Sequence, residues 1–401
     1  MNPPKKTSVL FITTSYPRYI DDHAGIFVHR FAKLLIKNNY KIRVITPNSK
    51  DTPKQDILDG VKINRFNYFF PSRYQKLGYE GGGTLANLRN SWLARLQLPL
   101  YLAFMLVKTV KYQNQADLIH CHWLPTALIA ILARTFSKKK PPIVFTNWGS
   151  DTRLLPQRLI NWTLARVDGC ISTAAETDEH LIKAGITDFA QIAAPVDEEK
   201  FNYQGKQYEL HKELNIPEST PIISFVGRLN YFKDPITFIQ SCHYLEQQGI
   251  NYFAVLAGDG DLYEECQSTI SDLGLDNKVK LLGMRKDTEN IFSSSTLTVH
   301  ISPIENTWAN TIAEAMFMHI PVIMTDVGYT KKTFTDEVDC LIVPAKEPIQ
   351  LGARIAALLK NTTLQKKLAD GAIILLHKHG KYTDEITEKL DHYYKTILTN
   401  K

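Results

Sequence analysis

Short apolar runs, many of them β-branched, recur along the chain and end at polar residues or at Gly and Pro, a pattern typical of buried strands. A first series of runs covers residues 9–13, 42–46, 118–121, 143–146 and 169–172, and a second covers 222–226, 253–257, 279–282, 297–301, 321–324 and 341–343. Segments with helical spacing of apolar residues lie between many of them. Because alternating strands and helices favour parallel sheets, the pattern predicts an α/β protein with two such sheets.

The stretch between the two series, residues 198–221, is polar, lacks an apolar period and contains two prolines. We place the domain boundary inside it, which gives an N-terminal domain over residues 1–205 and a C-terminal domain over residues 206–383, with a cleft between them. Residues 384–401 have amphipathic helical spacing, and we expect this last helix to pack back across either domain.

Composition supports a globular protein of the cytoplasm. The chain has 401 residues, 44% of them hydrophobic, and its five cysteines are far apart without a C-x-x-C pair, which argues against disulfides and zinc. The apolar run near the N-terminus is too short for a signal peptide. The longest apolar stretch, residues 96–107, contains Gln97 and Pro99. It falls below the roughly 18 residues that a membrane-spanning helix needs.

Charge is distributed unevenly. Residues 1–150 hold 22 lysines and arginines against 7 acidic residues, whereas residues 201–401 have a net charge of −5. The basic first half indicates an anionic partner, such as a lipid surface or a phosphorylated lipid. Nucleic acid is disfavoured because no nucleic-acid-binding motif is present. The leucines at 96, 98, 100 and 102, beside Arg89 and Arg95, either pack in the core or add a face for a membrane interface.

Candidate chemistry in the first half lies just after strands, where parallel sheets hold their ligands. Gly25 either brings a backbone N–H to a phosphate at a helix start or only makes a turn. His120 and His122 lie on the same side of an extended chain, and either flank a reacting centre or are hydrogen-bonded in the core. Asp151 either binds a hydroxyl or caps a helix.

The second half offers a candidate diphosphate site. Arg228 and Lys233 follow the strand at 222–226, and either bind a diphosphate or are solvated cations. After the strand at 297–301 a polar loop opens a helix near Asn310, whose free N–H groups suit the same phosphates. Glu314 lies one turn further along the same face and either accepts hydrogen bonds from a ribose diol or is solvated.

An ordered set of motifs resembles the retaining glycosyltransferases of family 4. The set comprises DLIHCHWLP, TNWGSD, APVDEEKF, GRLNYFKD, GDGDL, SPIENTWANTIAEAM and TDVG, and it covers most of the chain. The resemblance implies the GT-B fold, two Rossmann-like domains facing a cleft. It also implies transfer of a sugar, with retention, from a UDP- or GDP-linked donor to a lipid-linked or polysaccharide acceptor. Neither a metal nor a cofactor is expected, because cations and helix dipoles neutralise the leaving diphosphate.

The resemblance assigns the nucleotide part of the donor to the second half. It implies that Arg228 and Lys233 bind the diphosphate, that the N–H groups near Asn310 and Thr311 hold phosphate, and that Glu314 binds the ribose.

It assigns the remaining donor contacts to three other positions. Met284 matches a position near the base, Gly25 one near the phosphates, and His122 the histidine that faces the donor sugar. We take His122, Asn306, Arg228 and Lys233 as the catalytic set.

Two departures from the family pattern bear on the sugar and the acceptor. The family's Glu-x7-Glu motif ends at Glu314, and its first acid is either replaced by Asn306 or shifted to Glu305. Trp148 stands where many relatives carry histidine. We expect Trp148, Asp151 and Glu305 to contact acceptor or sugar.

Two other functions remain open: a nucleotide-sugar epimerase, and a catalytically impaired partner protein that binds a sugar nucleotide. As a transferase, the protein is expected at the inner face of the cell membrane, bound peripherally to an anionic surface.

Overall fold

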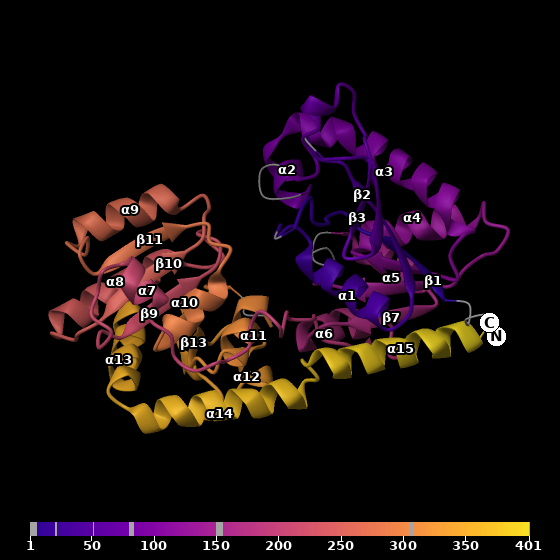
Figure 1. The fold of residues 1–401 in the computed structure, drawn as a ribbon. Helices are drawn as coiled ribbons and strands as arrows, with labels where there is room; N and C mark the ends of the chain where they lie inside the picture. The colour runs from indigo at the N-terminus through magenta and orange to yellow at the C-terminus, as the bar shows by residue number, and fades with distance from the viewer. Residues whose placement is uncertain are drawn as a thin grey trace. The chain divides into compact units, whose positions relative to one another are not determined.

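The computed structural model describes residues 6–20, 22–50, 52–79, 84–149, 155–304 and 308–400. It consists of two compact units, one formed by Met1–Pro195 with Thr383–Lys401 and the other by Val196–Tyr382. Each unit is a mainly parallel sheet covered by helices (Figure 1). The two predicted parallel-sheet domains are confirmed.

The sheet of the first unit has eight strands in the order β3-β4-β2-β1-β5-β6-β7-β8, and only the β3–β4 pair is antiparallel. Its strands are β1 (Ser8–Ile12), β2 (Lys41–Pro47), β3 (Gln55–Leu58), β4 (Val61–Phe66), β5 (Leu118–His122), β6 (Ile143–Asn147), β7 (Gly169–Ser172) and β8 (Ala190–Gln191).

Helices cover both faces of this sheet. Alternate residues of a strand point to opposite faces, and on β1 Leu10 packs in the same core as α3 and α4, whereas Phe11 packs with α1 and α15. The helices of the unit are α1 (Ile26–Lys37), α2 (Thr84–Asn90), α3 (Trp92–Gln113), α4 (Leu124–Arg134), α5 (Gln157–Leu164), α6 (Ala175–Lys183) and α15 (Thr383–Thr399), with a 3₁₀ turn at Ser72–Tyr74.

The second unit has six parallel strands in the order β11-β10-β9-β12-β13-β14. They are β9 (Ile222–Val226), β10 (Phe253–Ala257), β11 (Val279–Gly283), β12 (Leu297–His300), β13 (Val322–Thr325) and β14 (Leu341–Val343). Its helices are α7 (Glu209–Glu213), α8 (Pro235–Gln247), α9 (Tyr263–Asp272), α10 (Thr288–Ser294), α11 (Asn310–Phe317), α12 (Thr330–Thr333), α13 (Pro348–Leu359) and α14 (Thr362–Lys378).

The boundary between the two units differs from the predicted one, and the last helix packs on one of the two domains, as expected. The first unit ends at Pro195 rather than at residue 205, because Val196 and Phe201 pack in the core of the second unit. The C-terminal helix α15 belongs to the first unit: its Leu390 and Tyr394 are buried beside α1.

Strand β4 was not predicted, because its sequence VKINRF is rich in polar residues. Arg65 is nevertheless buried in it, since its guanidinium donates to the carbonyl oxygen of Pro17 at 2.8 Å and to Asp56 at 3.3 Å. Helix α3 is longer than the apolar stretch at 96–107, and by length and composition alone it is apolar enough to cross a membrane. Core helices of soluble proteins meet the same criterion, so the absence of a membrane-spanning helix stays a prediction. All five cysteines are buried and free.

Candidate functional site

Backbone hydrogen bonds tie together the loops at the carboxyl ends of β9, β10 and β11. Gly258 donates to the carbonyl oxygen of Gly283 at 2.8 Å, and Leu229 donates to that of Asp259 at 3.0 Å. A Cβ on Gly258 would lie 1.8 Å from the carbonyl oxygen of Gly227, so only glycine permits this approach. These contacts fix the backbone of the loop that carries Arg228.

A buried histidine links Lys233 to the start of α11. The ammonium of Lys233 donates to Nε2 of His300 at 3.1 Å, and Nδ1 of His300 lies 3.3 Å from the hydroxyl of Thr311. Since an ammonium only donates, the ring proton of His300 lies on Nδ1. Burial, and then the charge of Lys233, hold the pKa of His300 well below its ordinary value, so the ring stays neutral. The structure thus brings two of the predicted diphosphate ligands, Lys233 and Thr311, together at the carboxyl end of β12.

The other predicted nucleotide contacts surround this edge. Arg228 is exposed, and no partner for its guanidinium lies among the described residues. The first N–H groups of a helix have no intrahelical acceptors. Helix α11 begins at Asn310, and no side-chain cap accepts from these groups among the described residues. Glu314 is buried on the same helix, and Met284 is exposed directly after β11.

In the first unit, β5 carries two buried histidines whose ring centroids lie 4.3 Å apart. His120 is fully bonded: Nε2 lies 2.6 Å from the hydroxyl of Thr146, and Nδ1 lies 2.6 Å from that of Tyr394. Burial lowers the pKa of His120 to about 3. His120 therefore joins the sheet to α15. Of the two alternatives, these contacts support a hydrogen-bonded histidine in the core.

His122 differs because one of its nitrogens has no partner. The indole Nε1 of Trp148 donates to Nδ1 of His122 at 3.3 Å, and the two rings are stacked with centroids 6.0 Å apart. The ring proton must then lie on Nε2, which is buried and has no hydrogen-bond partner among the described residues. Burial, together with the neighbouring His120, keeps the pKa of His122 well below its ordinary value. His122 is a neutral donor, and Trp148 orients it.

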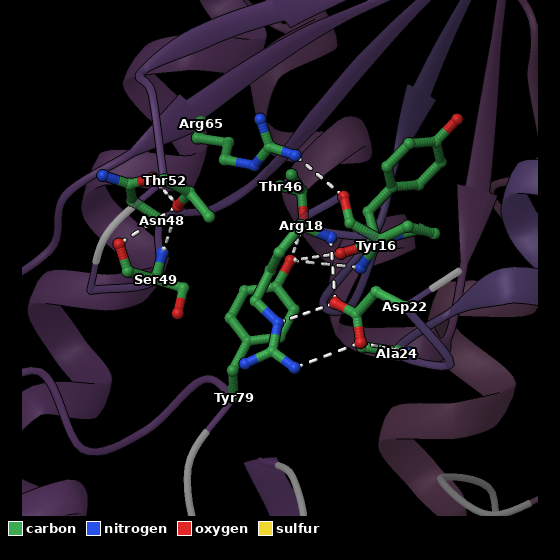
Figure 2. A network of polar contacts seen from close by, with 11 residues as sticks. Tyr16, Arg18, Asp22, Ala24, Thr46, Asn48, Ser49, Thr52, Arg65 and Tyr79 are labelled. Atoms are coloured by element: carbon green, nitrogen blue, oxygen red, sulfur yellow. Dashed lines mark hydrogen bonds and ion pairs between the residues drawn. The ribbon is translucent and has the colours of Figure 1, made fainter. Parts of the chain in front are cut away.

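The loop from β1 to α1 positions Gly25. Gly25 is the N-cap of α1 with φ of 63°, and a Cβ there would lie 2.3 Å from the carbonyl oxygen of Ser15. Figure 2 shows the polar network that holds this loop, in which Asp22 accepts hydrogen bonds from the Arg18 side chain and from the backbone N–H of Ala24. Burial raises the pKa of Asp22, but the hydrogen bonds from Arg18 and Ala24 outweigh that effect and lower the pKa below its ordinary value. The carboxylate therefore stays charged.

Tyr79 holds the same loop from the other side. Its hydroxyl accepts from the backbone N–H of Tyr16 at 3.1 Å, donates to the carbonyl oxygen of Tyr16 at 2.9 Å and lies 3.1 Å from Thr46 (Figure 2). The guanidinium of Arg18 lies over the Tyr79 ring, 5.3 Å from its centroid. Gly25 therefore begins α1 in a fixed place.

Three predicted residues, Asp151, Glu305 and Asn306, lie outside the described residues. Sequence reasoning missed His300, which lies inside an apolar run, and the residues Arg18, Asp22 and Tyr79 of the loop network. A polar side chain at the carboxyl end of a buried strand is the signal that would have identified His300.

Two family models match the chain. The model of glycosyl transferases group 1 matches residues 206–373, and that of glycosyltransferase family 4 matches residues 24–200.

Curated relatives match with low identity. An α-1,4-N-acetyl-D-galactosaminyltransferase of Campylobacter jejuni is 25% identical over 156 residues, which is 39% of this chain and 43% of that protein. The name of that enzyme gives a diphosphoundecaprenol-linked glycan as its substrate. An Escherichia coli α-1,3-galactosyltransferase is 25% identical over 273 residues, covering 64% of this chain and 68% of that protein. Its name gives UDP-galactose and GlcNAc-diphosphoundecaprenol as substrates.

The solved structure of the Anabaena protein HepE in complex with UDP has the same fold. It matches with a TM-score of 0.72 and 18% identity over 97% of this chain and 100% of that chain. The matching family models and the two Rossmann-like units indicate the same family of proteins. The chain belongs to the family 4 glycosyltransferases of the GT-B fold.

Proposed function

We propose that the protein transfers a sugar, with retention and without a bound metal, from a nucleoside diphosphate sugar to a lipid-linked acceptor in cell-surface glycan synthesis. The observation that carries this proposal is the chain of contacts from Lys233 through His300 to Thr311. These contacts hold an ammonium and a helix start at the carboxyl edge of one parallel sheet, and the exposed Arg228 follows β9 at the same edge.

This edge suits a diphosphate. A planar guanidinium binds phosphate oxygens bidentately, and an ammonium binds them as a point charge. The N-terminus of α11 adds N–H groups and the positive end of a helix dipole. Together they neutralise the negative charge that develops on the departing diphosphate, the role that a divalent cation fills in other transferases. We place UDP and GDP first among the donors.

His122 donates from Nε2 to a hydroxyl of the donor sugar. It does not act as a general base, because Nδ1 already accepts from Trp148 and Nε2 carries the proton. We therefore propose a same-face substitution, in which the departing phosphate takes the proton of the acceptor hydroxyl as the new bond forms. The released nucleoside diphosphate and the glycoside then account for all atoms.

The proposed acceptor is a polyprenyl diphosphate-linked glycan at the inner face of the cell membrane. The substrate names of the Campylobacter and Escherichia relatives support this class of acceptor. The excess of cations in residues 1–150 supports attraction to an anionic surface.

The experiment combines purified protein with UDP- and GDP-linked sugars and short-chain polyprenyl diphosphate glycans, and follows products by mass spectrometry. A glycosylated lipid is expected, and the anomeric configuration of the new linkage, read by NMR, is expected to match that of the donor. Lys233→Ala is expected to slow product formation strongly, while Lys280→Ala, a change of an exposed lysine on β11, leaves the rate of product formation unchanged.

Three outcomes would contradict the proposal. Conversion of the donor to an isomeric sugar nucleotide without acceptor would identify an epimerase. Tight nucleotide binding without transfer to any acceptor would identify a nonenzymatic partner protein. An inverted linkage would refute the same-face substitution.

A further inference from the structure

Helix α3 exposes a continuous apolar stripe. Its exposed residues recur every three or four positions, and Trp92, Leu96 and Val107 are 71%, 64% and 62% exposed. Leu100 and Phe104 lie between them on the same stripe and are also exposed. The four leucines considered in the sequence divide accordingly: those at 98 and 102 pack against the core, whereas those at 96 and 100 face outward.

Two glutamines of α3 lie on its inner side. Gln97 is buried, donates to the carbonyl oxygen of Tyr74 at 2.7 Å and accepts from the backbone N–H of Lys76 at 2.9 Å. Gln113 is also buried and donates to the carbonyl oxygen of Ala133 at 2.8 Å. These bonds hold α3 in the unit, so its outer apolar face is a surface of the folded domain.

Helix α4 extends this face. The helices α3 and α4 pack side by side (Figure 1), and the bond from Gln113 to Ala133 brings their C-terminal ends together. Close to that point Leu132 is 46% exposed and Phe136 is 67% exposed. We call the exposed apolar residues of α3, of α4 and of the turn that follows α4 the α3–α4 face; they are Trp92, Leu96, Leu100, Phe104, Val107, Leu132 and Phe136.

The charge around this face has one sign. Residues 84–116 contain no Asp or Glu, but they contain Arg89, Arg95, Lys108 and Lys111. Beyond Phe136 the chain continues with three exposed lysines at residues 138–140, one of which, Lys139, pairs with Asp117. An apolar stripe with a tryptophan at one end and cations at its margins is complementary to the interface of an anionic bilayer.

We propose that the α3–α4 face docks the protein on an anionic membrane, with α3 lying in the plane of the interface and its apolar stripe inserted among the acyl chains. The inference extends the proposed function, because a lipid-linked acceptor lies in a membrane. It needs neither donor nor acceptor, and it therefore stands or fails separately from transfer.

The test is flotation of the full-length protein with vesicles of phosphatidylcholine, with and without phosphatidylglycerol. The wild type is expected to float with anionic vesicles at low salt, and the bound fraction is expected to fall in high salt. Leu96→Glu combined with Phe104→Glu is expected to lower vesicle affinity at least tenfold. The matched control is Ile349→Glu with Ile374→Glu, which changes two exposed isoleucines of the second unit and is expected to leave binding unchanged.

Two further measurements keep the proposal falsifiable. Lys108→Gln with Lys111→Gln is expected to weaken binding to anionic vesicles and to reduce its salt dependence. Brominated acyl chains are expected to quench tryptophan fluorescence, and Trp92→Phe is expected to remove most of that quenching. Absence of flotation with anionic vesicles would overturn the proposal. A wild-type dimer that Leu96→Glu dissociates without lipid would instead assign the face to a second copy of the chain.

Discussion

The two sheets are built from similar βα units, but the side chains at the carboxyl ends of their strands differ in charge. In the first unit the edge carries neutral, buried histidines among aromatic rings, with His122 stacked on Trp148. In the second unit the edge carries cations, with Lys233 bonded to His300 and with Arg228 exposed. One edge therefore suits an uncharged polyol, and the other suits a diphosphate.

Burial explains much of this difference. A histidine removed from water is deprotonated unless a carboxylate pairs with it. His122 is hydrogen-bonded to an indole, and His300 is hydrogen-bonded to an ammonium and a hydroxyl. An arginine at the surface keeps both its charge and its hydrogen-bond donors. The depth at which a side chain is buried thus decides whether it carries a charge, even at similar strand-end positions.

The largest effect is expected from removal of the cations of the second unit. Lys233→Ala combined with Arg228→Ala is expected to lower kcat/KM about 10²–10³-fold, because charge developing on the diphosphate loses its donors. Steady-state transfer assays measure this loss. Lys280→Ala serves as the control, and an equal loss in that variant would refute the assignment.

The second largest effect is expected from removal of the Glu314 carboxylate on α11. Glu314→Ala is expected to weaken binding of the nucleoside diphosphate by about 1–3 kcal/mol, the cost of losing a charged hydrogen bond to the ribose. Calorimetry with UDP and with its 2′,3′-dideoxy analogue tests the contact. The wild type should discriminate between the two ligands and the variant should not. Equal discrimination in both would remove the ribose role.

The buried histidine of β5 predicts a dependence of stability on pH. The pKa of His120 is about 3 in the folded protein and about 6.5 when unfolded. Between these values the unfolded state binds more protons, so stability is complete above pH 6.5 and falls as the pH drops toward 3. From pH 7 to pH 5 this group should remove about 2 kcal/mol from the free energy of unfolding.

Urea titrations at the two pH values measure this change in the wild type and in His120→Gln. The variant is expected to lose about 2 kcal/mol less than the wild type between pH 7 and pH 5. His392→Gln, which changes an exposed histidine of α15, should behave as the wild type. The same pH dependence in His120→Gln would contradict the assignment.

The smallest effect concerns the indole that orients His122. Trp148→Phe keeps the stacked ring but removes the donor to Nδ1, and it is expected to lower kcat/KM about fivefold, roughly 1 kcal/mol. Nitrogen NMR of the imidazole gives an independent readout. The wild type should show the Nε2–H tautomer, and the variant a mixture of tautomers. An unchanged tautomer would show that Trp148 does not orient the ring.

The sequence predicted both sheets because buried parallel strands are apolar along their whole length. It also placed His122, Arg228 and Lys233 at strand ends. The partners of these residues were not predictable, since Trp148 lies 26 residues from His122, and His300 lies 67 residues from Lys233.

Two further features could not be read from the sequence. The burial of Arg65 depends on the carbonyl oxygen of Pro17, which only the folded chain brings close. Helix α3 is apolar on several sides, so its pattern did not reveal which leucines face outward.

The most direct test of the contrast between the two edges is calorimetric titration of UDP and of the accepted UDP-sugar onto Lys233→Ala and His122→Leu. The account predicts that Lys233→Ala weakens binding of both ligands by a similar factor. It predicts that His122→Leu weakens only the UDP-sugar, because its Nε2–H meets the sugar and not the diphosphate. Unchanged UDP affinity in Lys233→Ala, or an equal loss for both ligands in His122→Leu, would contradict it.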